Sequence, residues 1–149
     1  MIRTAIVTAP IRAAELLAEV TTAATGATTL FLGTVRDVND GCAVTGIEYS
    51  AYTAMAQDEL ARIAGEAAGR FPGVRIAVEH RVGTLGLTDV SVAIAVAHAR
   101  RAPALEAQRF VIEALKVRVP IWKREHYVDG DRRWVDPTAA SAVTDGVAR

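Results

Sequence analysis

The sequence lacks features that several classes of protein require. Its 149 residues include a single cysteine, Cys42, so an intrachain disulfide cannot form. Met1 leads directly into a strand-like run and not into an export signal. The longest apolar run, residues 90–99, is much shorter than the roughly twenty residues that a membrane-spanning helix needs. We therefore expect a soluble, cytoplasmic protein that does not enter a membrane.

An excess of charge of either sign is also missing. The chain has 17 basic and 17 acidic side chains, and its formal net charge is zero at pH 7. Such a chain has no overall field to hold nucleic acid or an anionic membrane, so any anion recognition must come from local clustering. This balance disfavours a general nucleic-acid binder.

Motifs for metals and common cofactors are absent as well. The histidines His80, His98 and His126 lie in separate segments without the spacing of a zinc site. The sequence has no glycine-rich phosphate loop and no Gly-x-Ser-x-Gly elbow. Cys42 follows Gly41, but nothing nearby in sequence supplies a base, so we interpret it as a small loop or strand residue. We predict no metal and no cofactor.

The periodicity of apolar residues predicts one layered domain over residues 1–136, followed by a loose tail over 137–149. We expect helices between Pro10 and Gly26, over 54–71 with one buried face, and over 103–118. Strands are expected at 2–8, 28–35, 44–52, 74–82, 90–98, 121–128 and 133–135, with a glycine-containing loop between 82 and 90. About three helices with mixed or antiparallel sheets indicate an α+β fold, not a doubly wound parallel one.

The stretch LKVRVPIWKREHY, residues 115–127, concentrates basic residues in this neutral chain. On a helical wheel Lys116 falls outside the apolar arc that contains Leu115, which favours a solvated lysine in the last turn of the helix. Pro120 ends the helix. Alternation beyond it places Lys123 and Arg124 on opposite faces of a strand.

Two interpretations of this strand remain open. It is either an exposed edge strand protected by charge, or the proline turn folds its start back beside the helix end and brings Lys116 and Lys123 into one cleft. A cleft with two amines suits an anionic substrate, and burial would lower the pKa of a lysine toward neutral pH.

Arginines at the ends of two other strands are further candidates. Arg100 and Arg101 stand where a strand gives way to a helix, so their guanidinium groups and the free N–H groups of the helix start suit a phosphate. Arg36 follows the strand TTLFLGTV in the same way. The alternative for each is a solvated loop charge, since solvated and functional residues both gather in loops.

Several segments together resemble the large, catalytic subunit of molybdopterin synthase. They are FLGTVRD (31–37), IEYSAYTAMA (47–56), HRVGTL (80–85), LKVRVPIWKRE (115–125) and GDRRWV (130–135). The resemblance implies an α/β hammerhead fold and a homodimer within a heterotetramer, with a small ubiquitin-like sulfur-carrier subunit at each end. It also implies a sulfurtransferase, which moves sulfur from the carrier's C-terminal Gly-Gly thiocarboxylate to cyclic pyranopterin monophosphate and forms the molybdopterin dithiolene.

The resemblance also implies a site. Lys116 and Lys123 match the family's two active-site lysines and are expected to be catalytic. The substrate pocket would be lined by these lysines together with Arg36, Arg100, Arg101, Arg124 and Glu125. Arg100 departs from the family, which usually has histidine there; His98, two residues earlier on the same strand face, is the candidate substitute. Arginine binds phosphate but does not shuttle protons near pH 7.

Two other functions remain as alternatives. One is a non-catalytic module of the same fold that binds an anion or nucleotide in the basic pocket. The other is a single-stranded nucleic-acid binder that stacks bases on Trp122 and Trp134, which the neutral charge disfavours.

Overall fold

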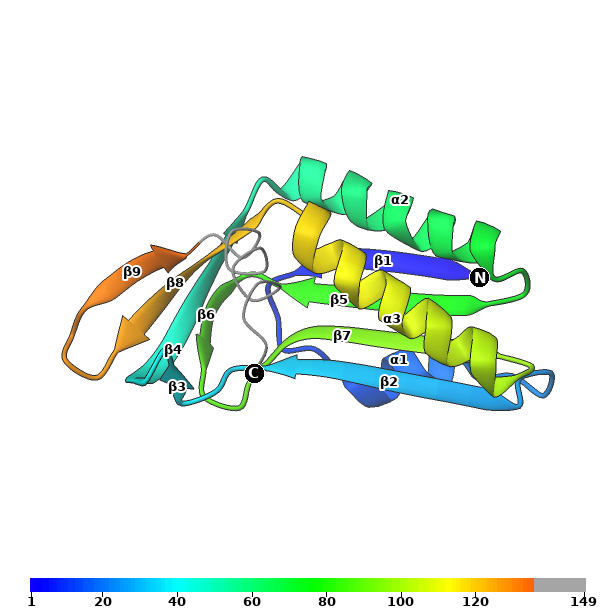
Figure 1. Ribbon diagram of the computed structural model, residues 1–149, viewed down its shortest axis with the longest axis horizontal. Helices are drawn as coiled ribbons and strands as arrows, with labels where there is room; N and C mark the ends of the chain where they lie inside the picture. The colour runs from blue at the N-terminus through cyan, green and yellow to red at the C-terminus, as the bar shows by residue number, and fades with distance from the viewer. Residues whose placement is uncertain (136–149) are drawn as a thin grey trace.

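The computed structural model describes residues 1–135 and contains three helices and two sheets, which confirms the α+β class (Figure 1). The helices are α1 (Ala13–Val20), α2 (Thr53–Arg70) and α3 (Arg101–Arg118). The strands are β1 (Ile2–Val7), β2 (Ala27–Thr34), β3 (Val38–Asn39), β4 (Cys42–Ala51), β5 (Arg75–Arg81), β6 (Gly83–Gly86), β7 (Val90–His98), β8 (Ile121–Tyr127) and β9 (Arg132–Val135). The expected tail, 137–149, lies outside the described residues.

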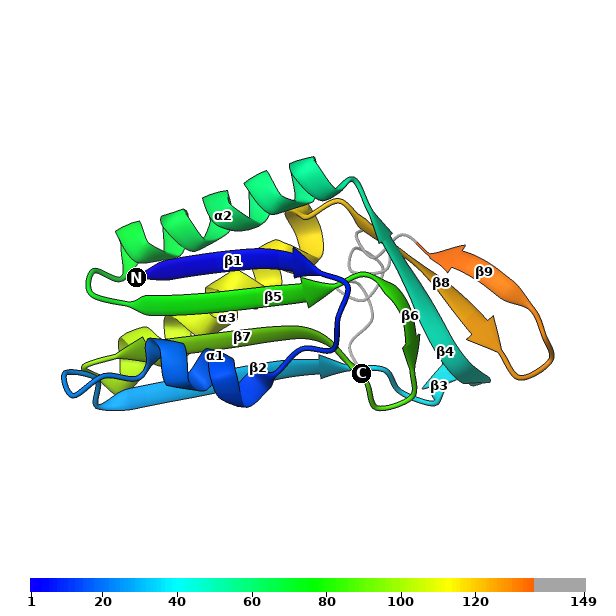
Figure 2. The ribbon, with the colours of Figure 1, turned by 180° about the vertical axis from the view of Figure 1, so that it is seen from behind.

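The first sheet has the strand order β1-β5-β7-β2 and is covered on both faces. Its β1 runs parallel to β5 and the other pairs are antiparallel, so the sheet is mixed, as predicted. Helices α2 and α3 lie on one face and α1 on the other (Figure 2). This double cover explains the long apolar run of β7, because a strand buried on both faces does not alternate.

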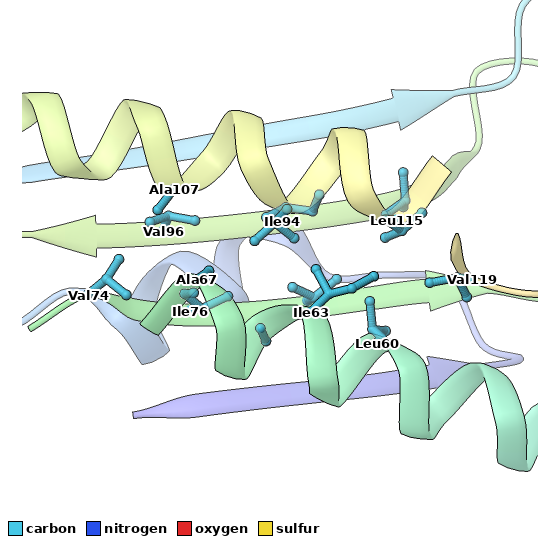
Figure 3. Packing of buried hydrophobic residues seen from close by; sticks show 14 of the residues in the cluster. Leu60, Ile63, Ala67, Val74, Ile76, Ile94, Val96, Ala107, Leu115 and Val119 are labelled. Atoms are coloured by element: carbon cyan, nitrogen blue, oxygen red, sulfur yellow. The ribbon is translucent and has the colours of Figure 1, made fainter. Parts of the chain in front are cut away.

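The main core lies between this sheet and the helices α2 and α3 (Figure 3). Five of the six residues in the apolar stripe predicted for α2 are buried there: Ala56, Leu60, Ile63, Ala64 and Ala67. The sixth, Phe71, is the C-cap and is only partly buried. From α3 come Ala107, Val111 and Leu115, which pack toward strand residues such as Ile94. Burying each large aliphatic side chain contributes roughly 1.5–3 kcal/mol. Leu115 therefore fixes the end of α3 on the sheet, one residue before Lys116.

The second sheet lies beyond one end of the first and has the order β3-β4-β8-β9, and β6 also pairs with β4 (Figure 1). The sequence predicted a loop where β6 forms, and this was wrong. The glycines Gly83 and Gly86 give no strand pattern in the sequence. The strand forms because it pairs with Gly46–Tyr49 of β4. At Gly46 an added Cβ would lie 2.8 Å from the Leu85 carbonyl oxygen, so glycine permits this close approach.

The outer edge of β1 is partly satisfied by a side chain of α2. The backbone N–H of Ile6 donates to Gln57 Oε1 at 3.0 Å, and Gln57 Nε2 donates to the Thr4 carbonyl at 2.9 Å. One amide thus makes the two hydrogen bonds that a neighbouring strand would make at this point.

Candidate active site

The candidate site lies where α3 gives way to β8. The backbone N–H of Val119 donates to the Leu115 carbonyl at 3.1 Å, and Ile121 then begins β8. The main core buries Leu115, Val119 and Ile121, and this packing holds the turn around Pro120 in place. Ile121, the first residue of β8, therefore lines the same small pocket as Leu115 and Lys116 from the last turn of α3.

Lys116 borders a small pocket at this junction instead of standing in solvent. Tyr49 of β4 and His80 of β5 line the pocket with it, over an apolar floor of Leu115, Val119 and Ile121. Burial lowers the pKa of Lys116, and the nearby Lys123 ammonium lowers it further. The solvated lysine that the helical pattern favoured was wrong, because strands distant in sequence cover this side of α3.

Lys123 lies on β8 directly opposite Tyr49 of β4, and it forms an ion pair. Its Nζ lies 3.3 Å from Glu125 Oε1, two residues along the same strand face. These two lysines are the only lysines of the chain. Lys123 is paired with a carboxylate, whereas Lys116 forms no ion pair among residues 1–135. The strand alternation that placed Lys123 and Glu125 on one face is confirmed.

Glu125 is only 1% exposed and is fully engaged by protein groups. Asn39 Nδ2 donates to its Oε2 at 2.7 Å, and the Tyr127 hydroxyl donates to the same oxygen. The bond to Glu125 raises the pKa of Tyr127. The remaining oxygen faces Lys123. Glu125 therefore contacts the lysine and not the open pocket.

Arg36 joins this network from the loop after β2. The residue is exposed, and its Nη2 donates to Asn39 Oδ1 at 3.5 Å. Through Asn39 and Glu125 the guanidinium group is linked to Lys123. The structure thus brings Arg36, Lys116, Lys123 and Glu125 to one end of the molecule.

The sequence interpretation missed two residues of the pocket, Tyr49 and His80. His80 is 3% exposed, its Nδ1 lies 3.0 Å from the Arg81 carbonyl oxygen, and its ring packs edge-on against Tyr49 at 5.4 Å between centroids. Nδ1 must carry the proton to bond a carbonyl. Burial, and to a lesser extent the Lys116 charge, lower the pKa of His80 to about 4.

A signal for His80 was present in the sequence. Ile76 and Val78 alternate along β5 toward the main core, and the same alternation places His80 on that buried face. The spacing of the histidines in the sequence tests His80 only as a metal ligand, and that criterion does not detect a buried pocket residue. Among residues 1–135 no group of three or more His, Cys, Asp or Glu side chains is arranged to hold a metal ion.

Arg100 and Arg101 lie at the other end of α3. Arg100 is the N-cap and Arg101 the first helical residue, so both stand at the start of the helix as predicted, although α3 begins two residues before the predicted residue 103. Lys116 lies fifteen positions after Arg101 along α3, which corresponds to roughly 22 Å. His98 stays with them: its Nδ1 accepts the Arg100 N–H at 3.0 Å and its Nε2 lies 3.0 Å from the Pro72 carbonyl oxygen. Within one chain these residues do not reach the lysine pocket.

Arg124 faces the opposite side of β8 from Lys123. Its Nη2 donates to Glu48 Oε2 at 2.7 Å, and its guanidinium carbon lies 5.1 Å from the centre of the Trp134 ring. The predicted divergence of Lys123 and Arg124 is confirmed. Of the two interpretations left open for this strand, the exposed edge strand is wrong, because β8 lies between β4 and β9.

The fold and the pocket define the class: an α+β protein with two lysines in unequal environments at a helix–strand junction. In residues 1–135 no helix is long and apolar enough to cross a membrane. Residues 6–118 match the family described as MoaE protein. A molybdopterin synthase catalytic subunit from Halalkalibacterium halodurans is 43% identical over 148 residues, covering 99% of this chain and 94% of that relative.

Solved structures agree with this match. The chain superimposes on the crystal structure of molybdopterin synthase from Staphylococcus aureus with a TM-score of 0.84 and 35% identity, covering 88% of this chain and 95% of that one. A Helicobacter pylori complex of subunits 1 and 2 of molybdopterin-converting factor, with a TM-score of 0.74, 24% identity and 89% coverage of each chain, shares the fold. The chain belongs to the MoaE family.

Proposed function

We propose that the chain is the catalytic subunit of a molybdopterin synthase, a sulfurtransferase of molybdenum cofactor biosynthesis. It would move sulfur from the C-terminal thiocarboxylate of a small carrier subunit to cyclic pyranopterin monophosphate and form the dithiolene. The observation that carries this proposal is the unequal lysine pair, with Lys116 desolvated and Lys123 held by Glu125. Membership of the MoaE family and the names of its relatives support the same reaction.

The environments of the two lysines suggest different roles. Lys116 has a lowered pKa in a pocket with an apolar floor, so its amine is more easily deprotonated at neutral pH and can exchange a proton or act as a nucleophile. Lys123 brings a positive charge that is fixed by its ion pair. A thiocarboxylate and a phosphate repel each other, and fixed cations in a partly dry site offset that repulsion. Lys116 is therefore the principal catalytic lysine and Lys123 assists it.

Substrate phosphate would be held by arginines. Arg36 is exposed beside the network of Lys123 and is the natural contact within the chain. Arg100 and Arg101 are too far along α3 to help in the same chain, so we assign them to the pocket of a second copy in a homodimer. Glu125 supports Lys123 without contacting substrate, and Arg124 is left outside the pocket because of its pairing with Glu48.

The working assembly would be a heterotetramer of two such chains and two carrier subunits in the cytoplasm. The complex of two subunits described for the Helicobacter pylori protein is a precedent for a partner on this fold. The reaction needs no metal or organic cofactor in this scheme, since the chemistry is proton transfer and charge stabilisation by side chains.

The test is molybdopterin formation with purified thiocarboxylated carrier and cyclic pyranopterin monophosphate. We expect Lys116→Ala and Lys116→Arg each to lower turnover by at least about a hundredfold, because arginine keeps the charge but not the proton transfer. Lys123→Arg is the matched control and should retain more activity, since its role is a charge. Near wild-type turnover in Lys116→Ala would contradict the assignment of Lys116 as the principal catalytic lysine.

The alternative from the sequence, a non-catalytic module that binds an anion or nucleotide in the same pocket, is not favoured, because the relatives are named molybdopterin synthase catalytic subunits. It would require that the wild-type chain bind the pterin, measured by calorimetry, and yield no molybdopterin with thiocarboxylated carrier.

A further inference from the structure

Asn39 lies in a hairpin at the edge of the second sheet. Strand β3 consists of Val38 and Asn39 and pairs with Ala43 and Cys42 of β4. The turn between them has positive φ angles of 49° at Asp40 and 75° at Gly41. This tight turn keeps Asn39 close to β4, and β8 is the next strand of the same sheet. The Asn39 side chain is half-buried and reaches Glu125 on β8.

The contacts of Glu125 divide between its two oxygens. Both neutral donors, Asn39 Nδ2 at 2.7 Å and the Tyr127 hydroxyl, bond Oε2. Lys123 Nζ approaches Oε1 at 3.3 Å. A carboxylate that is held by two donors on one oxygen cannot rotate freely, so the other oxygen stays directed at the lysine.

The other end of the Asn39 amide meets Arg36. Oδ1 accepts from Arg36 Nη2 at 3.5 Å, while Nδ2 donates to the carboxylate. An amide can accept from a guanidinium group and donate to a carboxylate at the same time, whereas an ionised aspartate is acceptor-only and leucine does neither. The residue type therefore matches the two neighbours.

We propose that Asn39 is a positioning residue of the sulfur-transfer site. It orients Glu125 toward Lys123 and holds Arg36 next to that ion pair. This inference rests on the proposed function. Its effect passes from Glu125 to Lys123, which faces Tyr49 of β4 and whose charge acts on Lys116 of α3. Lys116 shares its pocket with His80 of β5.

The chain offers a direct readout that needs no substrate. Lys116 and Lys123 are its only lysines, so acetic anhydride has just these two side-chain amines and the N-terminal amine to modify. Mass spectrometry after partial acetylation at a series of pH values gives the reactivity of each lysine. An amine reacts only when it is unprotonated, so loss or gain of a nearby negative charge changes its reactivity.

Two substitutions should act in opposite directions. In Asn39→Leu the carboxylate loses one of its fixed donors and its hold on Lys123, so Lys123 is acetylated faster. In Asn39→Asp a second carboxylate faces Glu125, so the added negative charge slows acetylation of Lys123 at alkaline pH. If Asn39 only stabilised the hairpin, both substitutions would change the acetylation rate of Lys123 in the same direction. Turnover should fall about tenfold in each variant, with a raised KM for the cyclic pterin because Arg36 is released.

Two further variants control the result. Val38→Ala changes the exposed neighbour in the same strand and should leave acetylation and turnover unchanged. Tyr127→Phe removes the other donor to Oε2 without touching the hairpin and should change Lys123 in the direction of Asn39→Leu, which keeps the test valid if an Asn39 variant does not fold. Wild-type acetylation and turnover in both Asn39 variants would overturn the proposal. If instead the acetylation changes appear but the wild-type chain makes no molybdopterin, the proposed function fails and the positioning role stands.

Discussion

The two sheets of this molecule bury different kinds of side chain. The first sheet is enclosed by helices on both faces, and its buried side chains, such as Ile76 and Val96, are almost entirely aliphatic. The second sheet has a smaller core of Val35, Val44, Ile47, Leu85 and Tyr127, and next to it lies the carboxylate of Glu125 with its lysine partner. Both sheets meet at the Lys116 pocket, where β5 supplies His80 and β4 supplies Tyr49.

This difference separates stability from chemistry. Aliphatic burial stabilises without regard to direction, whereas a buried carboxylate is tolerated only when its partners have the right geometry. A polar network such as that of Glu125 is therefore sensitive to small displacements. It depends on the first sheet to fix the end of α3 through Leu115, so that the lysines are placed by a rigid neighbour.

The largest effect on stability should follow from opening a cavity in the first sheet. We expect Ile94→Ala to lower the free energy of unfolding by about 2–5 kcal/mol, because Ile94 is fully buried between helix and strand. The matched change in the second sheet, Ile47→Ala, should cost less, since Ile47 is 8% exposed and its cluster is smaller. Urea unfolding measures both. Equal losses would contradict the contrast between the sheets.

A somewhat smaller effect should appear as a pH dependence at the boundary of the two sheets. Burial lowers the pKa of His80 to about 4 from 6.5, so between these pH values the unfolded chain binds more protons than the folded one. This contribution is complete above pH 6.5 and is lost as the pH falls toward 4, in total about 3 kcal/mol. His80→Asn keeps a donor for the Arg81 carbonyl and should flatten that part of the pH–stability curve. Identical slopes in the variant and the wild type would contradict the burial of His80 next to Lys116 and Tyr49.

The smallest effect is expected on the outer face of the second sheet. Arg124 and Glu48 are 28% and 30% exposed, so solvent screens their pair, and Arg124→Gln should change the free energy of unfolding by less than about 1 kcal/mol. Because the side chain points away from Lys123, the pH profile of molybdopterin formation should not move. A shifted profile would show that this face takes part in the reaction.

Local patterns predicted the elements that depend on local physics. The apolar stripe of α2 and the alternation along β8 follow from helical and strand periods, and both are confirmed. The short strands β3 and β6 were not predicted, because their glycines and turn residues give no strand pattern in the sequence. Both strands form through their pairing with β4. The solvated interpretation of Lys116 failed for a similar reason, since Tyr49 and His80 reach it from distant parts of the chain. The role of Arg100 and Arg101 stays a prediction, because a second copy would have to supply them.

The side-chain amide of Gln57 occupies part of the open edge of the first sheet at β1. An edge strand presents free N–H and C=O groups that can recruit another chain, and on β1 one such pair, at Thr4 and Ile6, is already occupied by a residue of the same molecule. The helix that supplies much of the core thus also limits growth of the sheet. A substitution at Gln57 that leaves folding intact would still make the folded protein more prone to edge-to-edge aggregation, a liability that thermal unfolding measurements would not reveal.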